Sequence, residues 1–184
     1  MRLFVAVNIP EGLKEDIFLL QDEFRGALAD VKWLNKDKFH LTLKFLGETD
    51  EGYIESIAAV IEKSLEGISS FQLAFFGAGV FPSLDRPRVI WVGASLGKEI
   101  LEKIAQNLDQ NLQHLGYQPE KRGFSVHLTL GRFRSQKNKT ALIKRMLASE
   151  KKEIGSFEIK TVDLMQSILH PEGPEYKCIK SISV

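Results

Sequence analysis

One tetrapeptide occurs twice in this chain of 184 residues, first as His40-Leu41-Thr42-Leu43 and again as His127-Leu128-Thr129-Leu130. Both copies lie in segments whose apolar residues alternate, a pattern typical of β-strands. An identical repeat in such a context indicates that the chain consists of two related halves. The fold must therefore place two similar strands in comparable positions.

Side chains alternate in direction along a strand, so each copy places its histidine and threonine on one face and its two leucines on the other. The leucines belong in a core. The opposite face of the first strand then presents His40 and Thr42, roughly 7 Å apart. The second strand presents His127 and Thr129 in the same way. If an approximate twofold axis relates the halves, the two imidazoles converge from opposite walls of a cleft.

The remaining pattern predicts mixed α and β structure around one body, because no linker is long enough to separate independent domains. Strands are expected at residues 2–9, 39–46, 71–75, 88–92, 124–130, 157–160, 162–169 and 176–179. Helices are expected from Pro10 to Leu28 and at residues 54–65, 101–115 and 140–148. Residues 77–87 and 171–174, which are rich in glycine and proline, are expected to form loops or turns.

Composition excludes several classes of protein. With 43% hydrophobic and 27% charged residues, the chain is neither disordered nor fibrous. No apolar stretch approaches the ~18 residues of a membrane span, and the N-terminus does not resemble a secretory signal. Cys178 is the only cysteine, which excludes an intramolecular disulfide and a cysteine-rich metal cluster. These features predict a cytoplasmic protein.

The net charge of +1 conceals an uneven distribution. Residues 121–152 contain ten basic side chains and one acidic side chain, so the rest of the chain is acidic on balance. Such a block is typical of an anion site or a nucleic-acid contact, and equally of a solvated basic helix. The basic residues are Lys121, Arg122, Arg132, Arg134, Lys137, Lys139, Lys144, Arg145, Lys151 and Lys152. Lys137 and Lys139 are expected on a loop beside the cleft, where they either contact the phosphates of a nucleic acid or form ordinary surface.

Two opposed histidines suit the cleavage of a phosphodiester. A base must deprotonate the attacking oxygen while an acid protonates the leaving oxygen, and in-line displacement puts these groups on opposite sides of the phosphorus. Imidazole titrates near neutrality and can take either role. The threonine hydroxyls can donate to non-bridging oxygens, and Arg132 can add a cation with planar donors. Strict alternation places Arg132 on the leucine face, so its role requires the strand to end or twist there.

Other interpretations stay open at this level. The histidines can be buried structural residues of a sheet, or ligands of a metal, although no carboxylate accompanies either motif. A module that binds RNA ends without catalysis would also use the basic segment. Trp33, Trp91 and Phe45 either stack on bases or belong to the core. His114, at the end of a helix, and His170, in a turn, are expected at the surface.

Taken together, these residues resemble the two-histidine (2H) phosphoesterases and, within them, the RNA 2′,3′-cyclic phosphodiesterases, also called 2′-5′ RNA ligases. The resemblance runs essentially from end to end. Two departures are Gly131, where alanine is common, and Val126, where proline is common. The matching segments are Arg2 to Val7, Trp33, His40 to Gly47, Phe81 to Pro82, Pro87 to Trp91, and His127 to Arg132.

The resemblance implies an α+β fold, bilobal and pseudo-twofold, in which two antiparallel β-sheets line a central cleft and the helices lie outside. Residues 1–184 would form a single 2H phosphoesterase domain of two lobes. It also implies hydrolysis of RNA 2′,3′-cyclic phosphate ends to 2′-phosphomonoesters without a metal or other cofactor. His40 would be the proton donor and His127 the proton acceptor. Thr42, Thr129 and Arg132 would bind the phosphate.

The expected substrates are RNA with a 2′,3′-cyclic phosphate end, tRNA fragments among them, or small cyclic nucleotides. Ligation of RNA through a 2′-5′ bond is the same chemistry reversed, with a 5′-hydroxyl in place of water. The chain is expected to be a monomer and to have no membrane partner.

Overall fold

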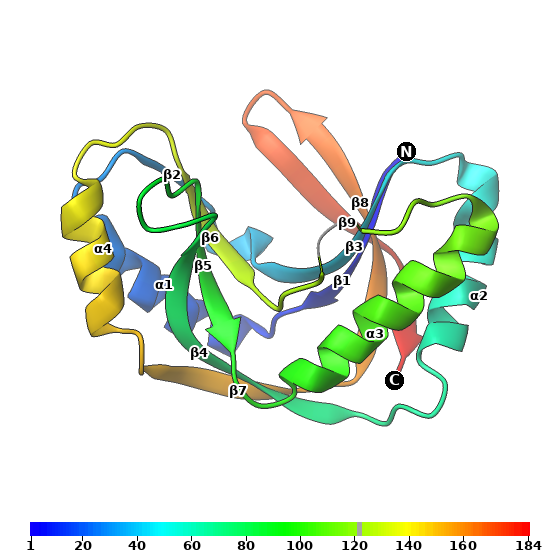
Figure 1. Ribbon diagram of the computed structural model, residues 1–184. Helices are drawn as coiled ribbons and strands as arrows, with labels where there is room; N and C mark the ends of the chain where they lie inside the picture. Colours follow the sequence, from blue (N-terminus) through cyan, green and yellow to red (C-terminus); the bar gives the residue numbers. More distant parts are fainter. Residues whose placement is uncertain (121–122) are drawn as a thin grey trace.

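The computed structural model describes residues 1–120 and 123–184, which form two antiparallel sheets (Figure 1). The first sheet contains, in spatial order, β3 (His40–Glu48), β1 (Arg2–Asn8), β8 (Thr161–His170) and β9 (Gly173–Ser183). The second contains β2 (Val31–Trp33), β6 (Leu128–Phe133), β5 (Val89–Ala94), β4 (Phe71–Phe81) and β7 (Glu153–Ile159). Each copy of the repeat therefore lies in a different sheet.

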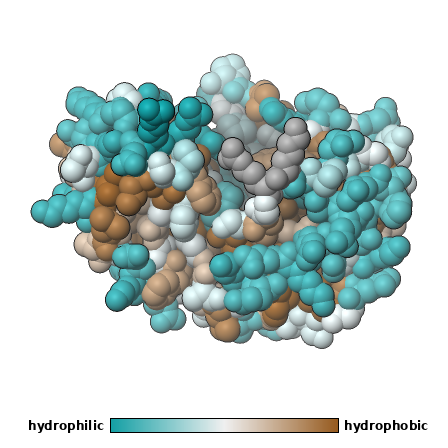
Figure 2. Space-filling view, in the orientation of Figure 1, coloured by the Kyte–Doolittle hydropathy of each residue, from teal (hydrophilic) through white to brown (hydrophobic). Residues whose placement is uncertain are grey.

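The helices cover the outer side of each sheet (Figure 1). Helices α2 (Ile54–Ser64) and α3 (Lys98–Asn111) pack on the first sheet, and α1 (Glu11–Arg25) and α4 (Lys139–Ala148) pack on the second. Figure 2 shows hydrophilic side chains over the outward surface of α3. Short 3-10 helices occupy Lys36–Lys38, Glu51–Tyr53 and Leu112–Leu115. The expected fold class, with two antiparallel sheets and helices outside, is confirmed.

The core lies on the leucine faces of the repeated strands. Leu41 and Leu43 are 1% and 4% exposed, and Leu128 and Leu130 are both 0% exposed. All four belong to one buried apolar cluster that continues through both lobes. Burying these faces against the helices leaves the histidine faces turned away from the core, as alternation requires.

β4 is longer than predicted, because it continues through residues expected to form a loop. Its last residues pair with β5, with Phe81 opposite Val89. A Cβ on Gly79 would collide with the Trp91 ring, so this glycine permits close packing within a strand. Gly79 therefore has a structural reason to be glycine, which is the close approach of the Trp91 ring and not a turn.

Other boundaries also differ from the prediction; β7 and β9, for example, begin at Glu153 and Gly173, ahead of the strands expected from residues 157 and 176. The strand expected at residues 124–130 begins at Leu128, since the pairing with β5 ends there. Helix α1 ends at Arg25, before Leu28, which has a φ of 54° and is 76% exposed. β2 was not predicted, because three residues are too few to show alternation.

Candidate active site

All five residues predicted to form the site line one cavity of about 570 Å³ between the two sheets. His40 and Thr42 reach it from β3, whereas His127, Thr129 and Arg132 reach it from β6 and the residue before it. The hairpin of β8 and β9 projects from the first sheet (Figure 1), and its residues Leu169 and Tyr176 also line the cavity. The structure thus brings the two motifs together as the repeat predicts.

The two histidines are held in the same way. Nδ1 of His40 lies 2.8 Å from the carbonyl oxygen of Lys38, and Nδ1 of His127 lies 2.7 Å from that of Ser125. In each half the carbonyl belongs to the residue two positions earlier. A carbonyl oxygen only accepts, so both Nδ1 atoms carry their proton. Nε2 is then the nitrogen of each ring that can exchange a proton with a substrate.

Two aromatic rings pack against His40, whereas one packs against His127. The His40 ring lies 5.1 Å from Phe4 and 4.8 Å from Tyr176, centroid to centroid. His127 has Phe81 at 5.1 Å, in an edge arrangement. Burial lowers the pKa of His40 below its usual value, and the positive charge of Lys14 acts in the same direction.

Two smaller features complete the environment of His40. The hydrogen bond from Nδ1 to the Lys38 carbonyl favours the protonated ring and partly opposes the fall in the His40 pKa. Nε2 of His40 lies 3.0 Å from Oγ1 of Thr42, so the reactive nitrogen already has a hydroxyl partner.

Burial raises the pKa of the Tyr176 hydroxyl, and the nearby charge of Arg132 opposes that rise. Arg132 therefore acts on a residue of the opposite sheet.

A β-bulge brings Arg132 into the cavity. Along β6, Thr129 lies opposite Trp91 and Gly131 lies opposite Ile90, so Leu130 is an extra residue in the pairing. Leu130 and Gly131 are both buried, and Arg132 returns to the histidine face. Strict alternation, which placed Arg132 on the leucine face, is corrected by this bulge.

A buried glutamine of α1 supports the bulge. Gln21 is 0% exposed, and its Nε2 donates to the carbonyl oxygens of Leu34 and Leu130, both at 2.9 Å. The Leu130 carbonyl also accepts from the backbone N–H of Leu34. The carbonyl of the extra residue, which the bulge removes from regular pairing, is satisfied in this way.

β3 contains a bulge at the same place relative to its motif. Thr42 lies opposite Ala6 and Lys44 lies opposite Val5, which leaves Leu43 as the extra residue. Leu43 and Lys44 are both buried, and Phe45 returns to the cleft face with 67% of its surface exposed. Phe45 is therefore the counterpart of Arg132 in the other half.

Of the three aromatic candidates, Trp33 and Phe45 line the cavity. Trp91 lies beside Phe81 at 5.0 Å, within the wall. Its Nε1 is buried, with no hydrogen-bond partner in the described part of the chain. Trp91 is thus a packing residue rather than a surface for a base.

Three side chains of the basic segment have partners outside the cavity. Lys139 donates to the carbonyl of Asp85, Lys152 pairs with Glu23, and Arg145 donates to the Glu23 carbonyl. Lys121 and Arg122 lie outside the described residues. Among the basic side chains of the segment, Arg132 lines the cavity.

Sequence reasoning missed Lys32 and Tyr176, which also line the cavity. No signal in the sequence pointed to Tyr176, because it lies outside both motifs. Its strand, β9, is placed near them only by pairing with β8, which pairs with β1. Lys32 precedes Trp33, a residue singled out in the sequence, but the short strand that holds it was not predicted. His114, in a 3-10 helix, is exposed as expected, and exposed His170 pairs with Glu175 at 2.9 Å.

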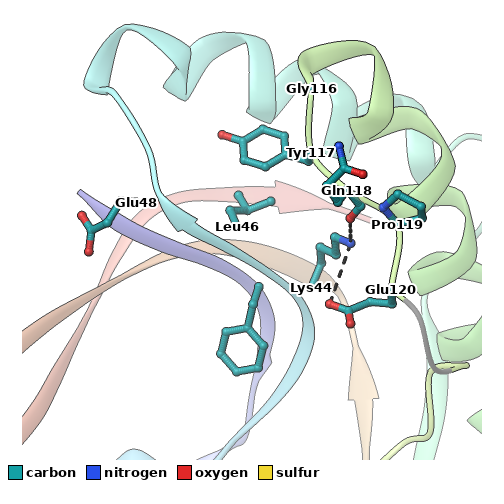
Figure 3. A pocket seen from close by; sticks show the side chains of 9 residues that line it. Lys44, Leu46, Glu48, Gly116, Tyr117, Gln118, Pro119 and Glu120 are labelled. Carbon is teal, nitrogen blue, oxygen red and sulfur yellow. Dashed lines mark hydrogen bonds and ion pairs between the residues drawn. The ribbon is translucent and has the colours of Figure 1, made fainter.

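A second hollow, of about 670 Å³, is lined by residues of β3 and by residues 116–120 (Figure 3). Lys44 is its central residue and is 3% exposed. Its Nζ donates to Asp109 and, at 2.7 Å, to the Gln118 carbonyl, and it lies 3.8 Å from Glu120. The lysine ties β3 to the segment after the Leu112–Leu115 helix, which is a structural role.

Neither a metal site nor a membrane-spanning helix is found in residues 1–120 and 123–184. No three His, Cys, Asp or Glu side chains there are grouped so as to hold a metal ion. Within the same residues, no helix has the length and apolar character needed to span a membrane.

Two His-x-Thr strands that face one cavity from separate antiparallel sheets are the arrangement of a two-histidine phosphoesterase. The sequence model of the LigT-like phosphoesterases matches residues 7–91 and 93–176, and the chain belongs to this family. Each matched segment contains one copy of the tetrapeptide. The family resemblance inferred from the motifs is thereby confirmed.

Relatives of known name agree. The chain is 35% identical over 176 residues to the RNA 2′,3′-cyclic phosphodiesterase of Methanothermobacter thermautotrophicus, covering 96% of this chain and 95% of that one. It is 37% identical over 180 residues to the protein of the same name from Methanocaldococcus jannaschii, covering 98% and 99%. The structure matches TT0787 of Thermus thermophilus with a TM-score of 0.80 at 25% identity, covering 100% of this chain and 97% of that one. It matches apo LigT of E. coli with a TM-score of 0.78 at 23% identity, covering 99% and 96%.

Proposed function

We infer that this chain is an RNA 2′,3′-cyclic phosphodiesterase. The observation that carries the inference is the placement of both histidines, each with Nδ1 held by a carbonyl, in one cavity. The archaeal relatives of that name match over nearly the whole of both chains. Because each lobe contributes one histidine, we treat residues 1–184 as a single catalytic domain, and one copy of the chain suffices for the reaction.

The reaction we propose opens the cyclic phosphate to a 2′-phosphomonoester. Water attacks the phosphorus while Nε2 of His127 accepts a proton from it. The bond between phosphorus and O3′ breaks on the opposite side, and Nε2 of His40 donates its proton to O3′. The products are a 2′-phosphate and a free 3′-hydroxyl. The assignment of donor and acceptor follows the family resemblance.

The lowered pKa of His40 bears on its role as the donor. In the free protein, burial favours the neutral ring, which has no proton on Nε2 to give. A bound phosphodiester places a negative charge beside the ring and stabilises the imidazolium. We propose that substrate binding itself raises the pKa of His40 and so prepares the acid.

The remaining groups stabilise charge on the phosphate. In the free protein the Thr42 hydroxyl donates to the unprotonated Nε2 of His40, and once that ring is protonated the hydroxyl is free to donate to a non-bridging oxygen. Thr129 occupies the equivalent position on β6, and Arg132 adds a permanent cation. These groups supply the positive charge and hydrogen-bond donors that the transition state needs, so the proposed reaction uses no metal.

Phosphorus NMR of a cyclic-phosphate oligoribonucleotide incubated with the protein and excess EDTA tests the proposal. We expect conversion to the 2′-monoester, with Thr129→Ala slower by about 10²-fold, as for other lost oxyanion donors. His114→Ala is the matched control for an exposed histidine. A 3′-monoester as product, or loss of activity in EDTA, would contradict this mechanism.

The same assay separates the alternatives. Comparing an RNA fragment, a tRNA fragment and a cyclic mononucleotide ranks the candidate substrates. Adding RNA with a 5′-hydroxyl detects ligation as a 2′-5′ product. Salt-sensitive RNA binding without turnover would instead indicate a module that only binds RNA ends.

A further inference from the structure

Two cations stand side by side at the edge of the cavity. β2 pairs with β6 so that Lys32 lies directly opposite Arg132. Both side chains are exposed, and both line the cavity that holds the histidines. Like charges directly opposite each other on neighbouring strands destabilise a sheet. The pair of Lys32 and Arg132 therefore destabilises the sheet, and a functional role for the pair would account for this.

No ion pair within the described part of the chain offsets this repulsion. None of the ion pairs formed within residues 1–120 and 123–184 includes Lys32 or Arg132. The lining of the cavity contains four basic side chains, Arg2, Lys32, Lys38 and Arg132, against one acidic side chain, Glu172. A cyclic phosphodiester carries a single negative charge. The cavity thus has more positive charge than the reacting phosphate needs.

The two cations occupy different places relative to the reaction. Arg132 is on the strand that presents Thr129, and its charge acts on Tyr176, the residue packed against His40. Lys32 is on β2, the edge strand, one strand further out. A chain that leaves the cavity across this edge passes Lys32 after Arg132. Lys32 is therefore placed for an anion next to the reacting phosphate.

The opposite wall has a different character at the matching position. There the bulge of β3 presents Phe45, with Phe4 at 6.2 Å and Tyr176 beyond it. Aromatic faces suit an unpaired base, whereas lysine and arginine suit a phosphate backbone. At these matching positions one wall therefore presents an aromatic ring and the other a cation.

We propose that Lys32, beside Arg132, binds the phosphate that links the terminal nucleotide to the preceding one. This inference rests on the proposed function and adds a substrate class to it. The enzyme then prefers RNA ends of at least two nucleotides to cyclic mononucleotides. Lys32 acts in binding and not in the chemical step.

Steady-state kinetics on two substrates test the proposal. One is a cyclic mononucleotide, and the other is a dinucleotide that ends in the same cyclic nucleotide. For Lys32→Ala we expect KM for the dinucleotide to rise about tenfold, as for one lost charged contact, with kcat within about twofold. KM for the mononucleotide stays within about twofold of wild type, because that substrate has no second phosphate. Lys32→Arg retains most of the dinucleotide preference.

The matched control is Lys103→Ala, which removes the same charge from an exposed lysine of α3. The salt dependence of the dinucleotide KM gives a second readout, since losing one phosphate contact lowers its logarithmic slope by about 0.7. An equal rise in KM for both substrates would assign Lys32 to the reacting phosphate and overturn the proposal. So would a dinucleotide KM no different from that of Lys103→Ala.

Failure of the proposed function is distinguishable from failure of this subsite. If the wild type opens neither substrate, the function is wrong, and equilibrium titration of the same two ligands still tests Lys32. Binding of the dinucleotide should then weaken in Lys32→Ala alone. Equal binding by Lys32→Ala and Lys103→Ala would overturn the subsite.

Discussion

The two strands that carry the repeated tetrapeptide share their geometry and differ in their surroundings. Both hold the histidine by its Nδ1, and both bulge after the threonine. Yet β3 then presents Phe45, and β6 presents Arg132. His40 is enclosed by Phe4 and Tyr176, whereas His127 has Phe81.

The comparison shows which features of the site are symmetric and which are not. Identical residues in identical local conformations produce the symmetric part, namely two Nε2 atoms and two hydroxyls facing one cavity. Residues outside the repeat produce the asymmetric part. The reaction needs one protonated and one neutral imidazole, and these different surroundings make the two histidines chemically inequivalent.

The largest expected effect is the loss of either histidine. His40→Ala and His127→Ala should each lower kcat/KM by about 10² to 10⁴, as for a lost general acid or base. The double variant should lose little more than either single one, because the two groups act in the same step. Rates on a cyclic-phosphate oligoribonucleotide measure this, with thermal unfolding as the control for folding. Near-full activity in either single variant would end the catalytic interpretation.

The next effect distinguishes the two bulge residues. Arg132→Ala should lower kcat/KM by about 10²-fold, mainly through kcat, because it removes charge stabilisation in the transition state. Phe45→Ala should raise KM by about tenfold and leave kcat nearly unchanged, since base stacking contributes about 1–3 kcal/mol to binding. Separate kcat and KM values for both variants are the measurement. If both variants changed the same parameter, Phe45 and Arg132 would not have these distinct roles.

The smallest effect concerns pH and His40. Because burial lowers its pKa in the folded protein, the unfolded chain takes up a proton first as pH falls below the ordinary value of about 6.5. This contribution to stability is therefore present above that pH and is lost as pH falls toward the lowered pKa. Urea unfolding between about pH 7 and pH 5 should show a shallower loss of stability for His40→Gln than for the wild type. An unchanged slope would mean that burial does not disfavour the charged ring.

Most helices and long strands could be predicted, because their apolar periodicity is a local property of the chain. β2 could not, since its three residues acquire a regular conformation only by pairing with β6. The extension of β4 to Phe81 was hidden for a related reason, as Gly79 marks contact with Trp91 and not a turn. The five predicted site residues do meet, because four of them lie in the repeat itself.

The sequence by itself determined which side chains of the repeat share a face: two histidines and two threonines, on faces opposite buried leucines. Alternation along a strand is local, and an identical motif folds identically. Only the tertiary structure decided that Arg132 enters the cavity, that Lys32 stands beside it, and that Tyr176 encloses His40. These outcomes depend on bulges in strand pairing and on contacts between strands far apart in sequence, and no local pattern encodes them.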